Sequence, residues 1–167
     1  IAGKVTINGQ ELSVKSISSG AFANVGIDTL VIGEGIERIS KNAFGNNNSM
    51  RAITLPSTLK IIGNQSFYDC SSLKELDIPE GVTTIEYGAF RSCEGLKKIV
   101  LPSTLTSIGG YAFSYSSGLN HVVSKITEPD SISQSVFATN DYYRDDSGNY
   151  HYIWNDGFDF DKIKSSA

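Results

Sequence analysis

A repeat of 23 residues constrains this chain more than any other feature of its sequence. Four columns of apolar residues keep this spacing. They are Phe44, Phe67, Phe90 and Phe113; Ile39, Ile62, Ile85 and Ile108; Pro56, Pro79 and Pro102; and Met50, Leu73, Leu96 and Leu119. The units 51–73 and 97–119 are identical at 11 of 23 positions. A unit this short cannot bury its own apolar face, so the repeat predicts a stack of equivalent coils, a solenoid, over residues 28–119.

Each unit has the pattern of a short strand followed by turns. Residues 75–78, for example, alternate polar and apolar, which is the period of a half-buried strand. Pro79 then ends the strand, because proline cannot extend a hydrogen-bonded ladder. We expect each unit to supply one short parallel strand, a second extended piece and a single turn of helix or 3-10 helix. The phenylalanines should stack as a continuous spine, to which Phe22 and Phe137 add one rung at each end.

The two ends of the chain depart from the repeat and predict caps. An Asn-Gly pair at 8–9 lies between two apolar stretches, which is a strong signal for a β-hairpin. We therefore interpret residues 1–27 as an N-terminal hairpin cap and a degenerate first repeat. Residues 120–167 read as a last degenerate repeat and a C-terminal cap, with a second hairpin around the Ser-Gly pair at 147–148.

The order LPSTL, Ile-Gly, Ala-Phe, Cys and Leu resembles the BspA-type leucine-rich repeat of bacterial cell-surface proteins, over roughly residues 5–137. The tail, 138–167, is similar to the ending often found in that family in the spacing of Gly148, Tyr150, Trp154, Phe158 and Ile163. The resemblance implies a single leucine-rich repeat domain over 1–167. Its fold would be a right-handed β/α superhelix of mostly short parallel strands with 3-10 or short helical turns, and with hairpin-like caps at both ends.

One turn position departs from the commoner leucine-rich repeat, which carries Asn there. This chain has Gly35, Thr58, Gly81 and Thr104 at that position. The Asn ladder of those repeats is therefore absent, and the turn amides and carbonyls need other partners. The threonine hydroxyls are the candidates for that task.

Composition excludes several classes of function. Eighteen acidic residues against 14 basic ones give a net charge of −4, which argues against a nucleic-acid partner. No run of about 18 apolar residues is present that could span a bilayer. No secretion signal opens the chain, but Ile1–Gly3 reads as the start of a trimmed sequence, so this does not argue against export. The family resemblance implies an extracellular or cell-surface location.

The sequence offers few candidates for catalytic or metal chemistry. Cys70 and Cys93 are one repeat apart, so they are predicted to lie close together, either as two buried thiols or as a disulfide. Neither His121 nor His151 belongs to a catalytic or metal-binding motif, and we expect no enzyme activity and no cofactor. The acidic tail has alternating oxygen-bearing residues at 145–149, but it lacks the Gly and Glu of an EF-hand calcium loop and reads as a solvated turn.

The exposed face of the predicted strands is the best candidate for a functional site. Strand alternation places Glu75, Lys98 and His121 in one outward column and Asp77 in the next, while Arg51, Lys74 and Lys97 flank them. The repeat keeps its apolar positions constant and varies these charged ones. The face is either a solvated surface without a ligand or a mixed-charge strip that binds a protein. The candidate binding residues are Arg51, Lys74, Glu75, Asp77, Lys97, Lys98 and His121.

Two functions of different class fit these observations. The first is a secreted or surface-displayed adhesion module that binds a host or bacterial surface or matrix protein through the strand face. The second is a passive spacer that holds another domain away from the cell surface. A carbohydrate binder or enzyme that uses Tyr142, Tyr143, Tyr150 and Trp154 is a third, weaker alternative. We expect a monomer, although nothing in the sequence determines the oligomeric state.

Overall fold

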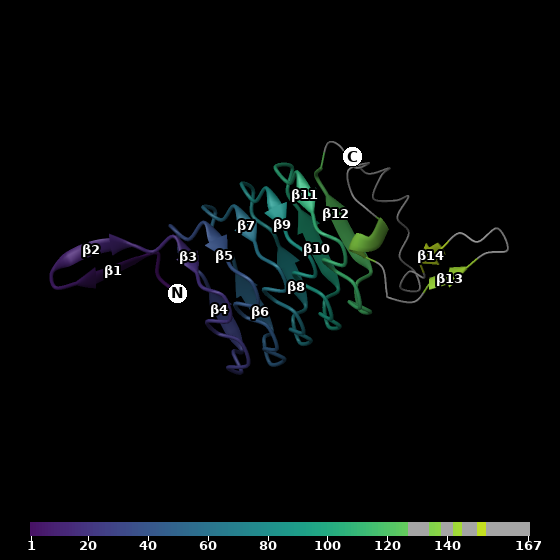
Figure 1. Cartoon of the computed structure of the whole chain (residues 1–167), viewed down its shortest axis with the longest axis horizontal. Helices are drawn as coiled ribbons and strands as arrows, with labels where there is room; N and C mark the ends of the chain where they lie inside the picture. Colours follow the sequence, from purple (N-terminus) through teal and green to yellow (C-terminus); the bar gives the residue numbers. More distant parts are fainter. Residues whose placement is uncertain (127–133, 138–141, 145–149, 153–167) are drawn as a thin grey trace.

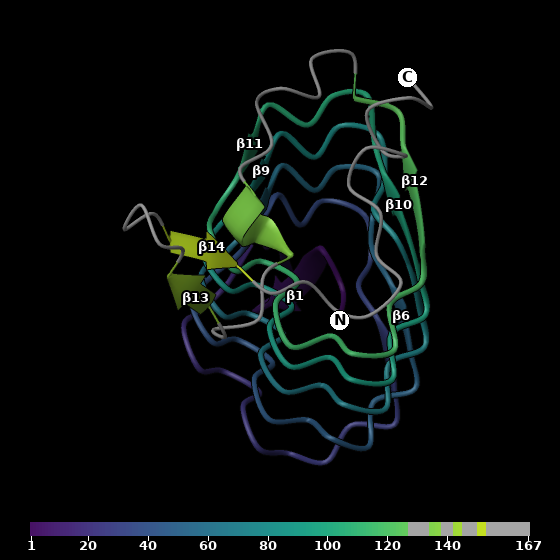
Figure 2. The same ribbon diagram turned by 90° about the vertical axis from the view of Figure 1, so that its right-hand side faces the viewer.

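The computed structural model describes residues 1–126, 134–137, 142–144 and 150–152. The repeats stack as coils of an elongated β-solenoid, with one coil for each 23-residue unit (Figure 1). Seen along the stack, each coil contributes a short strand to two sides of a common core (Figure 2). The predicted solenoid of short parallel strands is therefore confirmed.

One side of the solenoid is a continuous parallel ladder of five strands. These are β3 (Ser16–Ile17), β5 (Arg38–Ile39), β7 (Ile61–Ile62), β9 (Thr84–Ile85) and β11 (Ser107–Ile108). Paired residues are 23 apart from β5 onward, as when Ile39 pairs with Ile62. The second residue of each strand is an isoleucine that points into the core, so the register follows the repeat.

The other side carries the strands of the predicted functional face. They are β4 (Thr29–Val31), β6 (Ala52–Thr54), β8 (Glu75–Asp77), β10 (Lys98–Leu101) and β12 (His121–Ser124). Parallel ladders join β4 to β6, and β8 to β10 and β12. Within the described residues, β6 lies beside β8 without a ladder between them. The central residues Leu30, Leu76 and Ile99 are buried in the same core.

The predicted helical turn in each unit is not confirmed. In the part of the chain that the structure describes there is no α-helix, and the 3-10 helix η2 (Gln134–Val136) lies in the last, degenerate repeat, directly before Phe137. The third segment of each coil is a series of turns with residues at positive φ, such as Asn42 at 53° and Asn46 at 59°. Left-handed residues interrupt a right-handed helix. Alternate turn amides bond to the next coil, as Phe44 N–H does to Ser66 O at 2.8 Å, while those between them bond within the turn, as Ala43 N–H does to Ser40 O at 3.3 Å. The architecture is thus a β-solenoid and not a β/α superhelix.

The predicted phenylalanine spine forms along the whole stack. Phe44, Phe67, Phe90 and Phe113 are fully buried, and adjacent rings lie parallel with centroids 5.1–5.4 Å apart. Phe22 stacks on Phe44 at one end at 5.5 Å. Phe137 stacks on Phe113 at the other end, also at 5.5 Å. The aromatic repeat position therefore connects every coil from the first to the last described one.

A column of small polar side chains lies beside this spine. Its members are Asn47, Cys70, Cys93 and Ser116, all of which are buried. Each donates to the carbonyl of a phenylalanine one coil back, as Cys93 Sγ does to Phe67 O at 3.4 Å and Ser116 Oγ to Phe90 O at 3.3 Å. The position requires a small hydrogen-bond donor next to the spine. Both cysteines are free thiols in this column.

The threonine hydroxyls take the place of the missing Asn ladder, as predicted. Thr104 Oγ1 accepts from Gly81 N–H at 2.9 Å and donates to Val82 O at 2.8 Å. Thr58 repeats this arrangement with Gly35 N–H and Ile36 O, each at 2.9 Å. In both cases a coil with glycine at this turn is followed by a coil with threonine, whose hydroxyl bonds an amide and a carbonyl of the glycine turn.

We expect Thr104→Val to lower the free energy of unfolding by about 1–3 kcal/mol, because Gly81 N–H and Val82 O would lose their shared partner. Urea denaturation measures this loss. Thr106→Val is the matched control, since among the described residues Thr106 Oγ1 makes one exposed bond, to Thr83 O at 3.1 Å. Equal losses in the two variants would mean that the hydroxyl of Thr104 does not support the turn.

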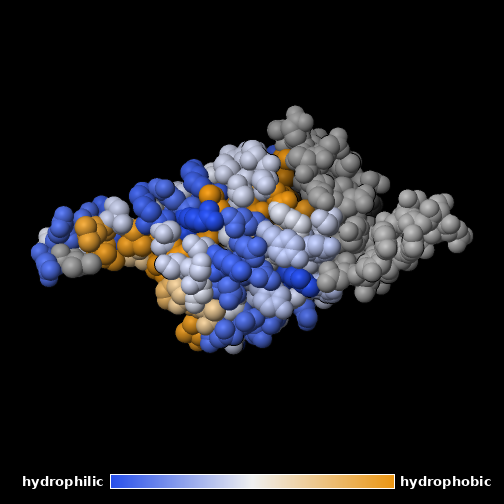
Figure 3. Space-filling view, in the orientation of Figure 1, coloured by the Kyte–Doolittle hydropathy of each residue, from blue (hydrophilic) through white to orange (hydrophobic). Residues whose placement is uncertain are grey.

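The predicted N-terminal hairpin forms, and its role as a cap stays a prediction. β1 (Lys4–Ile7) pairs antiparallel with β2 (Gln10–Ser13) across Asn8-Gly9, both at positive φ. The hairpin projects away from the stack (Figure 1) and exposes apolar surface (Figure 3). Val5 is 41% and Leu12 40% exposed. These two side chains of the hairpin therefore do not cover the first coil.

A second antiparallel hairpin follows the repeats, at the place where the sequence predicts one. It consists of β13 (Tyr142–Arg144) and β14 (Tyr150–Tyr152). The turn between these strands and the tail that follows them lie outside the described residues. The prediction that the aromatic residues of this region cover the last apolar rung therefore stays a prediction.

Candidate protein-binding face

The strand register brings the predicted charged residues onto one face. Lys98 pairs with Glu75 on one side and with His121 on the other, so these three form one column. Asp77 pairs with Val100 in the next column. Alternation turns these side chains outward, because the residues between them, Leu76 and Ile99, are buried.

The flanking basic residues form a column of their own just before the strands. Lys97 N–H donates to Lys74 O, and Arg51 N–H donates to Asp28 O on the preceding coil, each at 2.8 Å. Arg51, Lys74 and Lys97 are all exposed. Arg51 differs from the two lysines, because its Nε lies 3.1 Å from Asp28 Oδ1 in an ion pair.

The face divides into two halves where the ladder between β6 and β8 is interrupted. The half over β4 and β6 exposes uncharged residues such as Val31 and Thr54. The half over β8, β10 and β12 carries the charges of Glu75, Asp77 and Lys98. The structure thus concentrates the candidate residues on the second half, with Arg51 at its boundary.

The charges of this second half form no ion pair within the described residues. No ion pair of 4 Å or less involves Lys74, Lys97, Lys98, Glu75 or Asp77 there, although the register places Lys98 beside Glu75. Among the other described basic residues, Lys41, Lys60 and Arg91 form none either, whereas Lys4, Lys15, Arg38, Arg51 and Lys125 each form one. Lys98 is half-buried, and the other four side chains are exposed. These charges point to solvent from a rigid ladder, which suits recognition of another molecule better than stabilisation of the fold.

Metal binding and catalysis receive no support from the described residues. Among them, no group of three His, Cys, Asp or Glu side chains could hold a metal ion. The acidic residues considered for calcium at 145–149 lie outside the described part, as do Asp156, Asp159 and Asp161. Trp154 lies outside it too, and the tyrosines considered for carbohydrate binding are described only as parts of β13 and β14.

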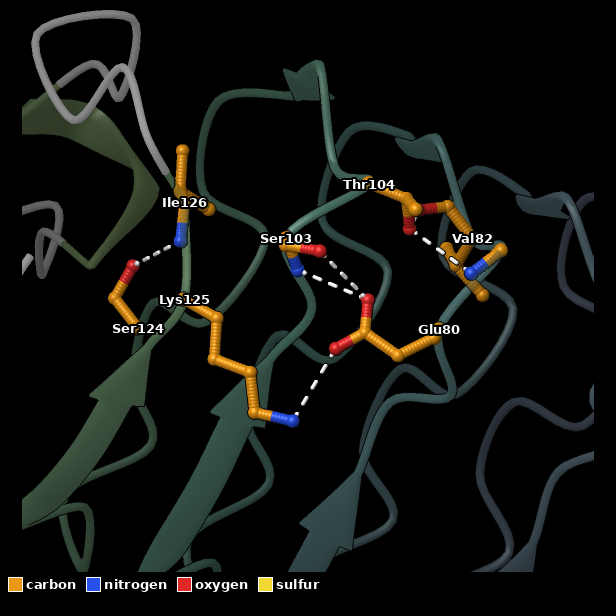
Figure 4. A network of polar contacts seen from close by, with 8 residues as sticks. Glu80, Val82, Ser103, Thr104, Ser124, Lys125 and Ile126 are labelled. Carbon is orange, nitrogen blue, oxygen red and sulfur yellow. Dashed lines mark hydrogen bonds and ion pairs between the residues drawn. The ribbon is translucent and has the colours of Figure 1, made fainter.

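Sequence reasoning missed a glutamate network at the edge of this face (Figure 4). Glu80 accepts from Ser103 N–H at 3.1 Å, from Ser103 Oγ at 3.0 Å and from Lys125 Nζ at 3.2 Å. Glu34 binds Ser57 in the same way, at 3.0 and 2.9 Å. These hydrogen bonds hold the pKa of both carboxyls below the ordinary value. The signal was present, because each Glu-Gly turn is followed 23 residues later by a Ser-Thr turn.

The stacked coils, the phenylalanine spine and the parallel ladders define a solenoid of the leucine-rich repeat class. A family model described as "BspA type Leucine rich repeat region" matches residues 13–143 in six copies. The chain therefore belongs to the BspA-type leucine-rich repeat family, as its sequence pattern predicted.

Solved structures of bacterial proteins share this fold. A leucine-rich cell surface protein from Faecalibacterium prausnitzii is 31% identical, with a TM-score of 0.68 over 73% of this chain and 33% of that one. A leucine-rich repeat protein from Bacteroides ovatus is 30% identical, with the same TM-score over 74% of this chain and 32% of that one. The pneumococcal vaccine antigen PcpA is 20% identical, with a TM-score of 0.56 over 83% of this chain and 40% of that one, and it shows the fold alone.

This chain spans about a third of the length of the first two of these proteins. No curated protein sequence matches it significantly. The described residues contain no helix with the length and apolar character needed to cross a membrane.

Proposed function

We propose that this chain is a secreted or surface-displayed module that binds a protein partner through the charged half of its strand face. The observation that carries the proposal is the set of charges on and just before β8 and β10, exposed at Lys74, Glu75, Asp77 and Lys97 and half-buried at Lys98, that form no ion pair within the described residues. A solenoid presents such residues at a fixed spacing, about 4.8 Å from one rung to the next. A partner with complementary charges could therefore be selected by position as well as by sign.

Two further observations support this proposal. Leucine-rich repeat solenoids generally serve as binding scaffolds with extended surfaces. The Faecalibacterium prausnitzii relative is described as a cell surface protein. We propose the same location for this chain, with a host or bacterial surface or matrix protein as the partner.

Charge reversal at Lys98 tests the proposed face. We expect Lys98→Glu to weaken capture of a protein partner from a panel of host matrix and bacterial surface proteins, and to do so more strongly at low salt. Screening shortens charge interactions to about 8 Å at 0.15 M ionic strength. The melting temperature should change little, because exposed charge pairs contribute only about 0.2–1 kcal/mol.

The matched control for this variant is Lys60→Glu. Lys60 is exposed beside β7, on the other side of the solenoid. If Lys98→Glu and Lys60→Glu bind the partner equally well, the strand face is not the binding site. A glycan array run in parallel would detect the carbohydrate-binding alternative.

A passive spacer is the second candidate function. The unbroken ladder from β3 to β11 and the continuous phenylalanine stack favour it, because both make the coil stack stiff along its length. If the chain binds nothing in either the protein panel or the glycan array, this alternative is favoured over the binding module.

A further inference from the structure

The N-terminal hairpin is an insertion within a coil. In the last described repeat, Lys125 N–H donates to Leu101 O at 3.0 Å, one coil back. Gly33 has the same repeat position as Lys125, and its N–H donates to Ile1 O at 2.7 Å. Ile1 therefore occupies the repeat position of Leu101. Val14 N–H then bonds to Gly3 O at 2.8 Å, so the coil resumes directly after the hairpin.

The coil does not need this hairpin for its closure. The corners described for the other coils are short turns, such as the three residues Gly33-Glu34-Gly35 between Ile32 and Ile36, whereas the twelve residues 2–13 lie between Ile1 and Val14. Within the described part of the chain, β1 and β2 pair only with each other. An isolated two-stranded ribbon is marginally stable at best in water. The insertion is thus extra structure that has open edges.

One face of the ribbon is apolar and exposed. Cross-strand register places Val5 opposite Leu12, and Lys4 opposite Ser13 on the other face. Lys4 and Glu11 form an ion pair at 2.7 Å. Val5 and Leu12 are 41% and 40% exposed on this face.

We propose that this hairpin is a self-association arm, in which β2 pairs antiparallel with β2 of a second copy of the chain. In an antiparallel hairpin, alternate residues turn their N–H and C=O groups outward. The Val14–Gly3 bond and the two-residue turn determine which residues these are. On β2 the backbone N–H and C=O groups of Glu11 and Ser13 point away from β1, and on β1 those of Lys4 and Thr6 point away from β2. The result would be a four-stranded sheet across the two copies.

The sequence of β2 is complementary to itself in this arrangement. A two-fold axis at Leu12 pairs Glu11 with Ser13 of the second copy, and Leu12 with Leu12 of the second copy. No like charges face each other, and the apolar row becomes Val5–Leu12–Leu12–Val5. β1 is the less suitable edge, because it carries Lys4, a residue type that discourages edge pairing, and because Val5 is smaller than Leu12. The contact is small, so the dimer should form in a concentration-dependent manner.

Sedimentation equilibrium of the full chain over a range of concentrations tests the proposal, which differs from the expectation of a monomer. We expect reversible dimers in the wild type. Replacing residues 4–13 with Asn-Gly should abolish them, because the Val14–Gly3 bond then closes a tight β-turn without the hairpin. The melting temperature should stay nearly unchanged, which would show that the coil is intact.

Two proline variants form a matched pair that identifies the edge. Glu11→Pro removes an outward N–H from β2 and should abolish dimers, whereas Thr6→Pro removes one from β1 and should retain them. A wild type that stays monomeric at every concentration overturns the proposal. So do dimers that survive the hairpin replacement, and dimers lost in Thr6→Pro but kept in Glu11→Pro. Circular dichroism confirms that each variant is folded.

Discussion

Replacing Phe67 with alanine is expected to lower the free energy of unfolding by about 3–5 kcal/mol, the range for a buried phenylalanine. Phe67 is 0% exposed and is stacked between Phe44 and Phe90, with ring centroids 5.2 and 5.1 Å away. Truncation removes both ring contacts and leaves a cavity that neighbouring coils cannot close, because their ladders hold them at a fixed spacing. Urea denaturation measures the loss.

Phe22→Ala is the internal control for this prediction. Phe22 is 36% exposed and stacks on Phe44, while its other side ends the described stack. Phe22→Ala should therefore lower the free energy of unfolding clearly less than Phe67→Ala does. A loss below about 1 kcal/mol for Phe67→Ala would contradict the importance of the spine.

The two cysteines are expected to resist alkylation in the folded protein and to react rapidly in denaturant. Burial raises the pKa of Cys70 from 9.0 to about 12 and raises that of Cys93 as well. The thiolate is the reactive form, and the raised pKa of Cys70 lowers the thiolate population of this residue about a thousandfold at pH 8. Mass spectrometry after iodoacetamide treatment should show two modified thiols in denaturant without reductant. Finding none would reveal a disulfide.

The same shift predicts how stability depends on alkaline pH. Above pH 9 the unfolded chain releases the thiol protons, while the folded chain keeps them. Stability is therefore fully present below pH 9 and falls as the pH rises towards about 12. The variant with both Cys70→Ser and Cys93→Ser should lose this slope yet remain folded, because Ser116 shows that a hydroxyl can bind the phenylalanine carbonyl at this position. A slope that persists in this variant would assign it to other groups.

The period of 23 residues predicted most of the core. Once equivalent residues are stacked, each position either points inward in every coil or outward in every coil, which is why the phenylalanine column could be identified without a structure. The threonine substitution for an Asn ladder could be predicted for the same reason, since Thr58 and Thr104 recur at one turn. The family also followed from these repeated positions.

The prediction of a helical turn in each unit was not confirmed, because a short apolar pattern does not indicate whether φ is negative or positive at each residue. Residues such as Gln65 and Asp69 have positive φ, although neither is a glycine. Bonds to the adjacent coil hold them there, as when Asp69 N–H donates to Arg91 O at 2.9 Å. Asn and Asp favour positive φ and stand at some of these turn positions, but Gln65, Ser92 and Tyr111 give no such local signal.

The sequence by itself determined the repeat, the core columns and the set of outward charges, because these depend only on spacing along the chain. Tertiary structure decided which charges are paired. Arg51 forms an ion pair with Asp28, whereas Lys74 and Lys97 form no ion pair among the described residues. It also decided that the hairpin interrupts a coil, since Ile1 was recognised as a repeat position only through its bond to Gly33. Both outcomes depend on contacts between coils, and the stacking of one coil on the next brings those atoms together.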